Sequence, residues 1–243
     1  MSADLPEAGR GPDAGRVADP REAYSYRHPG SGEWAPPRHC GPLEDAHRNY
    51  VDPAWELLEP RLSAHPNGPP GQERSWRALV IGFGRGFEVA ALLRKHRATT
   101  SNARILITGL EPHPDLLAPW PPRWHEFETG EAPWWGRAAG TWPMETAAWR
   151  LEIVPQRAQD WLQGQPPHCL DLILLDLFSP GRVAQDWEPS IFPELARVAA
   201  PEAVLTTYTC ARSVRDGLAT TGWQASILRR TGVRDSLRAT RTT

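Results

Sequence analysis

Ala78-Leu79-Val80-Ile81-Gly82-Phe83-Gly84-Arg85-Gly86-Phe87-Glu88 is a short apolar run that ends in three alternating glycines. Residues 78–81 predict a buried strand, and residues 87–93 predict a helix that opens directly after the turn. In a doubly wound α/β sheet, such a turn presents backbone N–H groups to a ligand. A tight turn without a ligand would have the same sequence, so the stretch predicts the fold class and leaves the ligand open.

Further strands and helices alternate after this turn. Apolar runs predict strands at 105–110, 151–154, 170–175, 204–208, 224–228 and 236–240, and helices at 158–162, 193–199 and 213–220. The run 170–175 is almost continuously apolar, as central parallel strands are. We therefore expect an α/β protein with a Rossmann-like, mostly parallel sheet and helices on both faces.

The chain before residue 74 is expected to be an extension of this core. Residues 1–20 have no apolar periodicity and predict a disordered tail. Within 21–73, the segment between Tyr26 and Trp34 predicts a short hairpin, residues 42–62 predict a helix interrupted near Pro53, and 65–73 have the composition of a linker. The core then occupies 74–243, with a tryptophan-rich insert at 118–149.

Composition and charge exclude several classes of protein. Of 243 residues, 40% are hydrophobic, which is enough to build a core and excludes wholesale disorder. The net charge of -2 provides no global attraction to nucleic acid or to an anionic membrane. Three scattered cysteines, an acidic N-terminus and the lack of a long apolar run predict a cytoplasmic protein without a metal site.

The spacing of the glycines separates two classes of ligand. The dinucleotide fingerprint requires glycine at the first, third and sixth places, but the sixth place here is Phe87. Glycine at places one, three and five resembles instead the first motif of class I S-adenosylmethionine-dependent methyltransferases. Glu111 ends the next strand, where a carboxylate can accept hydrogen bonds from both ribose hydroxyls of an adenosine. A surface acid at a strand end is the alternative interpretation.

A second carboxylate, Asp176, follows the strand at 170–175. Methyl transfer requires a neutral nucleophile in line with the methyl group, so an amine substrate must lose a proton beside the cofactor. At this edge of the sheet, Asp176 can accept the ammonium hydrogen bond and orient the lone pair. The alternative is a residue that merely caps the following turn.

The sequence around Asp176 carries a more specific pattern. It combines an Asp-x-Phe-Ser-Pro loop, a tryptophan, a Phe-containing helix, a Thr-rich strand and a Val-Arg-x-x-Leu helix; the matching positions are Asp176, Phe178, Ser179, Pro180, Trp187, Phe192, Thr207, Thr209, Val214, Arg215 and Leu218. With the glycine turn at 81–86 and the segment at 41–46, this pattern resembles the MnmC-like tRNA (5-methylaminomethyl-2-thiouridine)(34) methyltransferase domain.

The resemblance implies a stand-alone class I methyltransferase that uses S-adenosyl-L-methionine to methylate the aminomethyl nitrogen on the wobble uridine of tRNA. A separate FAD-dependent oxidoreductase would prepare that amine. The implied cofactor contacts are Gly82, Phe83, Gly84, Gly86, Glu111, Gln156, Arg157 and Glu44, and the implied catalytic residues are Asp176, Phe178 and Trp187. Where the family usually has Gly-Asp, this chain has Gln156-Arg157, and Gln159 or Asp160 is expected to substitute.

Two other functions stay open at this point: methylation of a small-molecule amine by a divergent member of the family, and a non-catalytic cofactor-binding protein of the same fold. The insert holds six of the 12 tryptophans, which are expected to pack mainly on one another, with Trp134 and Trp135 left to line the site. Residues 212–241 hold seven arginines and two aspartates, which indicates either a phosphate-binding face or an ordinary solvated surface.

Overall fold

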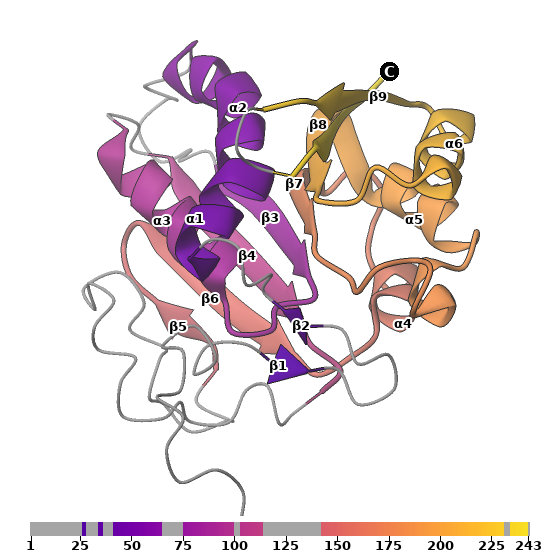
Figure 1. Cartoon of the computed structure of the whole chain (residues 1–243). Coiled ribbons are helices and arrows are strands. Elements are labelled where there is room, and N and C mark those ends of the chain that lie inside the picture. The colour runs from indigo at the N-terminus through magenta and orange to yellow at the C-terminus, as the bar shows by residue number, and fades with distance from the viewer. Residues whose placement is uncertain are drawn as a thin grey trace, which may run out of the picture.

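The computed structural model of the chain describes residues 26–27, 34–35, 41–64, 75–99, 103–113, 142–230 and 234–242 (Figure 1). The strands are β1 Tyr26–Arg27, β2 Trp34–Ala35, β3 Ser75–Ile81, β4 Arg104–Leu110, β5 Met144–Glu145, β6 Trp149–Val154, β7 Leu170–Leu175, β8 Ala199–Thr207, β9 Trp223–Leu228 and β10 Ser236–Arg241. The helices are α1 Pro42–Ala46, α2 Asp52–Ala64, α3 Phe87–Ala98, α4 Ala158–Gln163, α5 Ile191–Val198 and α6 Arg212–Thr220, with a π-helical turn η2 at His47–Val51 and a 3-10 turn η6 at Ala184–Trp187. The expected tail at 1–20, the linker at 65–73 and the insert up to residue 141 lie outside the described residues.

The main sheet has β3 near its centre and the strand order β5-β6-β4-β3-β7-β8-β10-β9. β3 is parallel to β4 and β7, and parallel pairing continues to β6 on one side and to β8 on the other. β10 and the edge strand β5 are antiparallel to their partners. The expected mostly parallel α/β sheet is therefore confirmed.

The order of the strands reverses between β3 and β7. From β3 the chain proceeds to β4 and β6, and it then crosses to β7 and β8 on the other side of β3. Open α/β sheets bind their ligands at the carboxyl ends of the strands, at such a reversal. β3 and β7 end side by side, with Ile81 paired to Leu175. The residues that follow, Gly82 and Asp176, therefore occupy the expected position of a ligand site.

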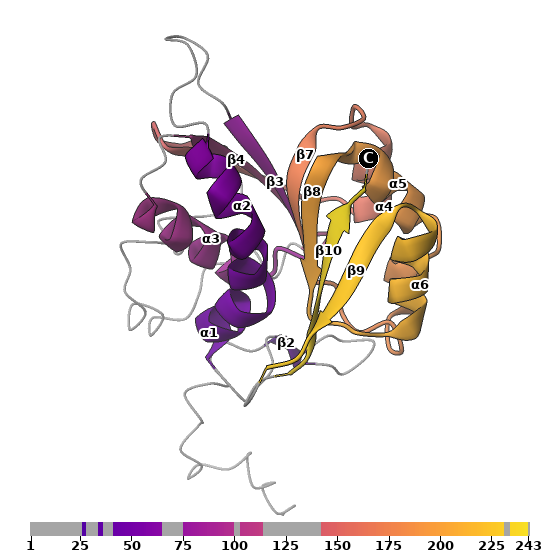
Figure 2. The same cartoon turned by 90° about the horizontal axis from the view of Figure 1, so that it is seen from above.

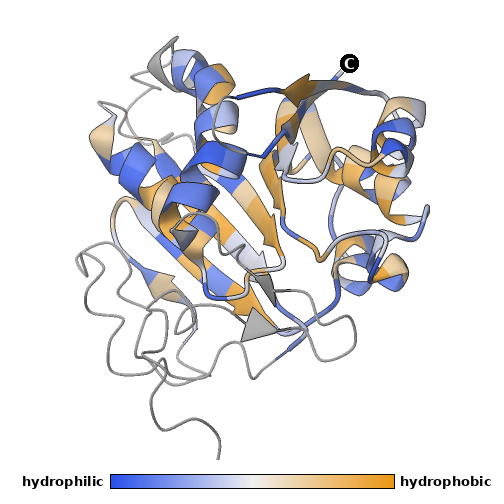
Figure 3. Ribbon diagram, viewed as in Figure 1, coloured by the Kyte–Doolittle hydropathy of each residue, from blue (hydrophilic) through white to orange (hydrophobic). Residues whose placement is uncertain are grey.

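Two layers of helices enclose the sheet, one on each face. Successive side chains of a strand point to opposite faces, so each central strand contributes to both cores. From β3, Ala78 and Val80 pack with the layer that contains α1, α2 and α3, whereas Leu79 and Ile81 pack with the layer that contains α4, α5 and α6. Figure 2 shows the two groups of helices on opposite sides of the sheet. In Figure 3 hydrophobic residues are concentrated in the strands, and the helices combine hydrophobic and polar segments.

The helical segment at 42–64 continues through Pro53 instead of breaking there. The expected interruption takes the form of η2, in which the Asp52 N–H donates to the carbonyl of His47, five residues back. Pro53 has no N–H to donate to the preceding turn, and the carbonyl of Arg48, five residues back, accepts a hydrogen bond from the Arg230 guanidinium instead. In the segment where the sequence predicts a hairpin, β1 and β2 pair antiparallel. None of the helices in the described parts of the chain is both long and apolar enough to cross a membrane.

Candidate active site

The turn after β3 lies against the backbone of the residue after β7. The Asp176 N–H donates to the carbonyl of Ile81 at 2.8 Å. Gly82 has a φ of +81°, and a Cβ at this position would lie 2.1 Å from the carbonyl oxygen of Asp176. Only glycine tolerates both the backbone conformation and the close approach. The close packing of the two strand ends thus requires glycine at position 82, whether or not a ligand binds there.

The rest of the glycine turn is tied to the end of β4. The N–H groups of Gly82 and Phe83 donate to the carbonyl of Leu110 at 3.1 and 2.9 Å. Phe83 is buried, and its ring covers Gly109, where a Cβ would lie 2.5 Å from a ring atom. Gly86 directly precedes α3. The side chain of Phe83 therefore supports the turn from the core, and the turn leads into the N-terminus of α3.

Glu111 connects the glycine turn to the residues after β4. It is 3% exposed, and its carboxylate oxygens accept the Gly84 N–H at 2.7 Å and the His113 N–H at 2.9 Å. Burial raises the pKa of Glu111 to about 7, against the opposing effect of these two hydrogen bonds. Each carboxylate oxygen has a second lone pair, so the group can still accept ribose hydroxyls. This donor and acceptor set fits a nucleoside cofactor.

The residues after β6 hold the loop that follows β7. Arg157, the residue before α4, pairs with Asp186 at 2.9 Å and donates to the carbonyl of Gln185 at 3.1 Å. Gln159 donates to the carbonyls of Gln185 and Asp186. Gln156 is exposed at the end of β6. Arg157 and Gln159 therefore anchor the loop after β7. The hydrogen bonds found in the described residues do not tie the side chain of Gln156 to this loop.

Phe178 and Trp187 belong to the loop after β7. Trp187, in η6, is 7% exposed, and its indole Nε1 donates to the carbonyl of Phe178 at 2.6 Å. Its ring packs in the core layer on the side of α4, α5 and α6. Phe178 itself is half-buried. Trp187 thus supports the loop from the core, and its hydrogen bond holds the loop backbone at Phe178.

Asp176 belongs to a buried group that the motifs do not single out. Tyr50, in η2, is 1% exposed and donates its hydroxyl to Oδ1 of Asp176. Asp45 of α1 and Glu88 of α3 are also buried, and their charges act on Tyr50. Burial, followed by the charge of Asp176, raises the pKa of Glu88 well above its usual range. From its helical spacing Tyr50 is indistinguishable from a core residue. The signal in the sequence is Glu88, a carboxylate in the otherwise apolar first half of α3.

Glu44, in contrast, is exposed on α1. Its carboxylate pairs with Arg48 one turn later at 2.5 Å. The next residue, Asp45, is 4% exposed and accepts a hydrogen bond from Asn49 at 2.8 Å. A cofactor contact for Glu44 stays a prediction, and the acid that this segment contributes to the buried group around Tyr50 is Asp45.

The arginines at 212–241 divide between two edges of the sheet. β9 is parallel to β8, so Arg212 after β8 and Arg229 after β9 lie at the edge where Asp176 lies. Their side chains are 86% and 82% exposed. Arg238 and Arg241 instead donate to carbonyls of the protein, those of Pro53, Ala196 and Gly222. The basic surface beside the site is therefore smaller than the count of arginines indicates.

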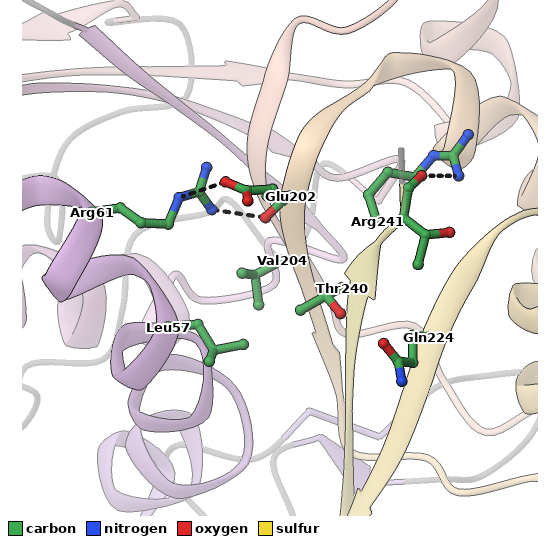
Figure 4. A pocket seen from close by; sticks show the side chains of 8 residues that line it. Leu57, Arg61, Glu202, Val204, Gln224, Thr240 and Arg241 are labelled. Atoms are coloured by element: carbon green, nitrogen blue, oxygen red, sulfur yellow. Dashed lines mark hydrogen bonds and ion pairs between the residues drawn. The ribbon is translucent and has the colours of Figure 1, made fainter.

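A separate hollow of about 470 Å³ lies toward the opposite edge of the sheet (Figure 4). It is lined by Leu57, Arg61, Glu202, Val204, Gln224, Thr240, Arg241 and Thr242. Arg61 donates to the carbonyl of Glu202 at 2.7 Å and pairs with its carboxylate at 3.7 Å, and Arg241 donates to the carbonyl of Thr242. Both guanidinium groups are thus engaged within the protein, and no motif residue lines this hollow.

The tryptophan-rich insert is described only at its end. Trp142 and Trp149 are partly buried and pack against the core layer that contains α1, α2 and α3. They therefore contribute to the main core as well as to the insert. The prediction that Trp134 and Trp135 line the site falls outside the described residues.

Comparison with known proteins places this geometry in a family. Residues 126–242 match the family described as S-adenosyl-L-methionine-dependent methyltransferase. The crystal structure of MnmC2 from Aquifex aeolicus aligns with a TM-score of 0.67 and 19% identity, over 88% of this chain and 65% of that chain. At this identity the likeness shows a shared fold.

Curated relatives are more similar in sequence. The tRNA 5-methylaminomethyl-2-thiouridine biosynthesis bifunctional protein MnmC of Ralstonia nicotianae is 44% identical over 171 residues, which are 65% of this chain and 26% of that protein. The protein of the same name from Azoarcus sp. is 33% identical over 175 residues, 65% of this chain and 27% of that protein. The chain thus spans about a quarter of the length of the curated relatives that it matches.

The reversal of the strand order, the glycine turn and the family match define a Rossmann-like methyltransferase whose cofactor is S-adenosyl-L-methionine. Within this class, the chain is similar in sequence to MnmC over 65% of its length. The expected fold class, enzyme class and cofactor are therefore confirmed.

Proposed function

We propose that this enzyme methylates the aminomethyl nitrogen on the wobble uridine of tRNA. The observation that carries the proposal is the position of Asp176, at the end of β7 and against the glycine turn, in a chain whose relatives are named for tRNA 5-methylaminomethyl-2-thiouridine biosynthesis. A carboxylate at this point suits an amine acceptor, because the amine must be oriented and must lose a proton.

The proposed roles divide the site into a cofactor part and an acceptor part. The backbone of Gly82 and Gly84 contacts the methionine portion, Glu111 accepts the ribose hydroxyls, and Gln156 lies on the side of the adenine. When bound, S-adenosyl-L-methionine supplies an electrophilic methyl group on a sulfonium.

On the acceptor side, the carboxylate of Asp176 accepts a hydrogen bond from the ammonium form of the amine and takes up its proton. The half-buried ring of Phe178 forms a wall of the acceptor pocket, and Trp187 holds the backbone of that wall. Arg157 keeps the loop in place through Asp186. The loop after β7 thereby restricts how the amine can approach Asp176.

The amine itself must come from an earlier reaction. We propose that a FAD-dependent oxidoreductase produces it, since the relatives are bifunctional proteins of which this chain matches about a quarter. A tRNA acceptor also requires that the enzyme acts in the cytoplasm.

A small-molecule amine is the second candidate acceptor. It is favoured by the internal contacts of Arg238 and Arg241, which reduce the basic surface available to a polyanion. Asp176 would serve a small amine equally well, so the acceptor has to be tested directly.

The test is methylation of undermodified tRNA, isolated from cells that lack this activity, by the purified protein with S-adenosyl-L-methionine. Nucleoside mass spectrometry should show conversion of the aminomethyl nucleoside to its methylaminomethyl form. The matched control, Asp176→Asn, should bind the cofactor and leave the nucleoside unchanged. Methylation of simple amines with no change in the tRNA would replace the proposal with the second candidate.

A further inference from the structure

We infer that Tyr50 is a positioning residue for methyl transfer, because its hydroxyl holds the carboxylate of Asp176 in the orientation that receives the acceptor amine. This inference rests on the proposed function of Asp176. It makes the helical segment before the core a part of the active site rather than an appendage.

The contact between Tyr50 and Asp176 joins two distant parts of the chain. The two residues are 126 positions apart, and the Tyr50 hydroxyl donates to Oδ1 of Asp176. The backbone of Asp176 is held separately, since its N–H donates to the carbonyl of Ile81. The protein thus fixes both the backbone and one carboxylate oxygen of Asp176. A residue that only capped a turn would not need a buried partner from another element.

The π-helical turn accounts for the position of Tyr50. π-Helical turns inside α-helices are rare and occur frequently at functional sites. Here the turn at 47–51 places Asn49, Tyr50 and Val51 on the buried side in succession, each at most 2% exposed. Tyr50 is the fourth residue of this turn, and its hydroxyl reaches Asp176. The turn thereby brings the phenol to Asp176 while the helix still packs on the sheet.

The surrounding charges keep Tyr50 a hydrogen-bond donor. Burial, followed by the negative charges of Asp176, Glu88 and Asp45, raises the pKa of Tyr50 well above its usual range. Loss of the proton would add another negative charge to this group, so the hydroxyl stays protonated at physiological pH. Across the described ranges, no group of three or more His, Cys, Asp and Glu residues is arranged to hold a metal ion. The hydrogen bond from Tyr50 is a contact that orders this carboxylate.

Tyr50→Phe tests the inference, because it removes the hydroxyl and keeps the buried ring. We expect kcat with undermodified tRNA to fall roughly 10-fold to 100-fold, the usual effect of a lost hydrogen bond to a charged group. The KM for S-adenosyl-L-methionine should not change. The acid limb of the kcat profile should move to higher pH, since a carboxylate without its donor is protonated more easily. The titratable groups that face this pair are Asp45 from α1 and Glu88 from α3.

Two controls separate positioning from a structural effect. Trp55→Phe changes a buried aromatic residue of the neighbouring α2, which is 4% exposed, and should leave kcat and the pH profile unchanged. In the Asp176→Asn background, Tyr50→Phe should cause no further loss of kcat, because the hydroxyl acts through the carboxylate. Additive losses, or an equal loss in Trp55→Phe, would overturn the inference.

A second measurement does not depend on the acceptor. The carboxyl carbon of Asp176 can be followed by NMR in protein with ¹³C-labelled aspartate and assigned with Asp176→Asn. Tyr50→Phe should move its titration midpoint to higher pH, and an unchanged midpoint would overturn the inference. Failure of the wild-type enzyme to methylate tRNA would instead contradict the proposed function alone.

Discussion

Two carboxylates follow β4 and β7, the strands on either side of β3, and their surroundings differ. Glu111 is almost fully buried and accepts main-chain N–H groups from two loops. Asp176 is half-buried and accepts the hydroxyl of Tyr50. The residue types are close to identical, so in the proposed function their positions in the topology and their partners assign Glu111 to the cofactor and Asp176 to the acceptor.

At Glu111, cofactor binding should depend on pH. Its pKa of about 7 lies above the usual value because of burial, so the group binds a proton near neutral pH. Ribose hydroxyls donate to the ionised form, and below pH 7 a proton must leave before binding. The affinity for S-adenosyl-L-methionine should therefore fall roughly tenfold per pH unit below 7 and stay constant above it. Calorimetry in buffers of different ionisation enthalpy measures this proton release.

Glu111→Ala is the control for that pH dependence. The variant should bind the cofactor with about 2–4 kcal/mol less free energy, since two charge-assisted hydrogen bonds are lost, and its affinity should no longer change between pH 6 and 8. Wild-type affinity that is constant across this range would contradict the role of Glu111.

At Asp176, the expected effect is on transfer and not on cofactor binding. Asp176→Asn keeps the shape and removes the charge, so turnover should fall by roughly 10²–10⁴. Steady-state kinetics and calorimetry on the same preparation separate the two quantities. If the cofactor affinity fell in proportion to turnover, Asp176 would belong to the cofactor site.

Among the elements, the central strands could be predicted well, and the irregular turns could not. The run at 170–175 coincides with β7, because a strand buried on both faces is apolar throughout. β8 begins at Ala199 instead of 204, since Pro201 and Glu202 interrupt the apolar pattern while the backbone continues the strand. η2 has no signature in sequence, because its wider turn depends on packing against the sheet. For the same reason the contact between Tyr50 and Asp176 could not be predicted, and the buried acid Glu88 is the one signal of this group in the sequence.

Gly82→Ala tests the contact between the ends of β3 and β7. The added Cβ would meet the backbone of Asp176 at 2.1 Å, and the φ of +81° is unfavourable for alanine. The free energy of unfolding should fall by at least ~2 kcal/mol, as measured by urea denaturation.

Gly181→Ala is the matched control in the loop after β7. A Cβ there meets nothing within 4 Å, so the change should stay within ~0.5 kcal/mol. Equal stability of both variants would show that the two strand ends are not packed as described.

For the whole molecule, the distribution of charge decides how an RNA substrate can bind. The net charge is -2, and the exposed arginines Arg212 and Arg229 stand at the edge that carries Asp176. Phosphate contacts must therefore be local and few. A tRNA acceptor should still give a KM that rises steeply with salt, because bound counterions are released, whereas a small amine should hardly respond.

Arg212→Ala and Arg229→Ala should each reduce the slope of log KM for tRNA against log salt by about one. Arg97→Ala, in the last turn of α3 and away from the site, is the control and should leave the slope unchanged. Slopes that are the same in all three variants would place the tRNA contact elsewhere on the molecule.

The most direct measurement is the content of modified wobble nucleosides in tRNA from cells in which the gene for this protein has been deleted. The account predicts accumulation of the aminomethyl nucleoside, reversal by the wild-type protein, and no reversal by Asp176→Asn or by a variant that does not bind S-adenosyl-L-methionine. An unchanged nucleoside profile in the deletion strain, or full reversal by Asp176→Asn, would contradict it.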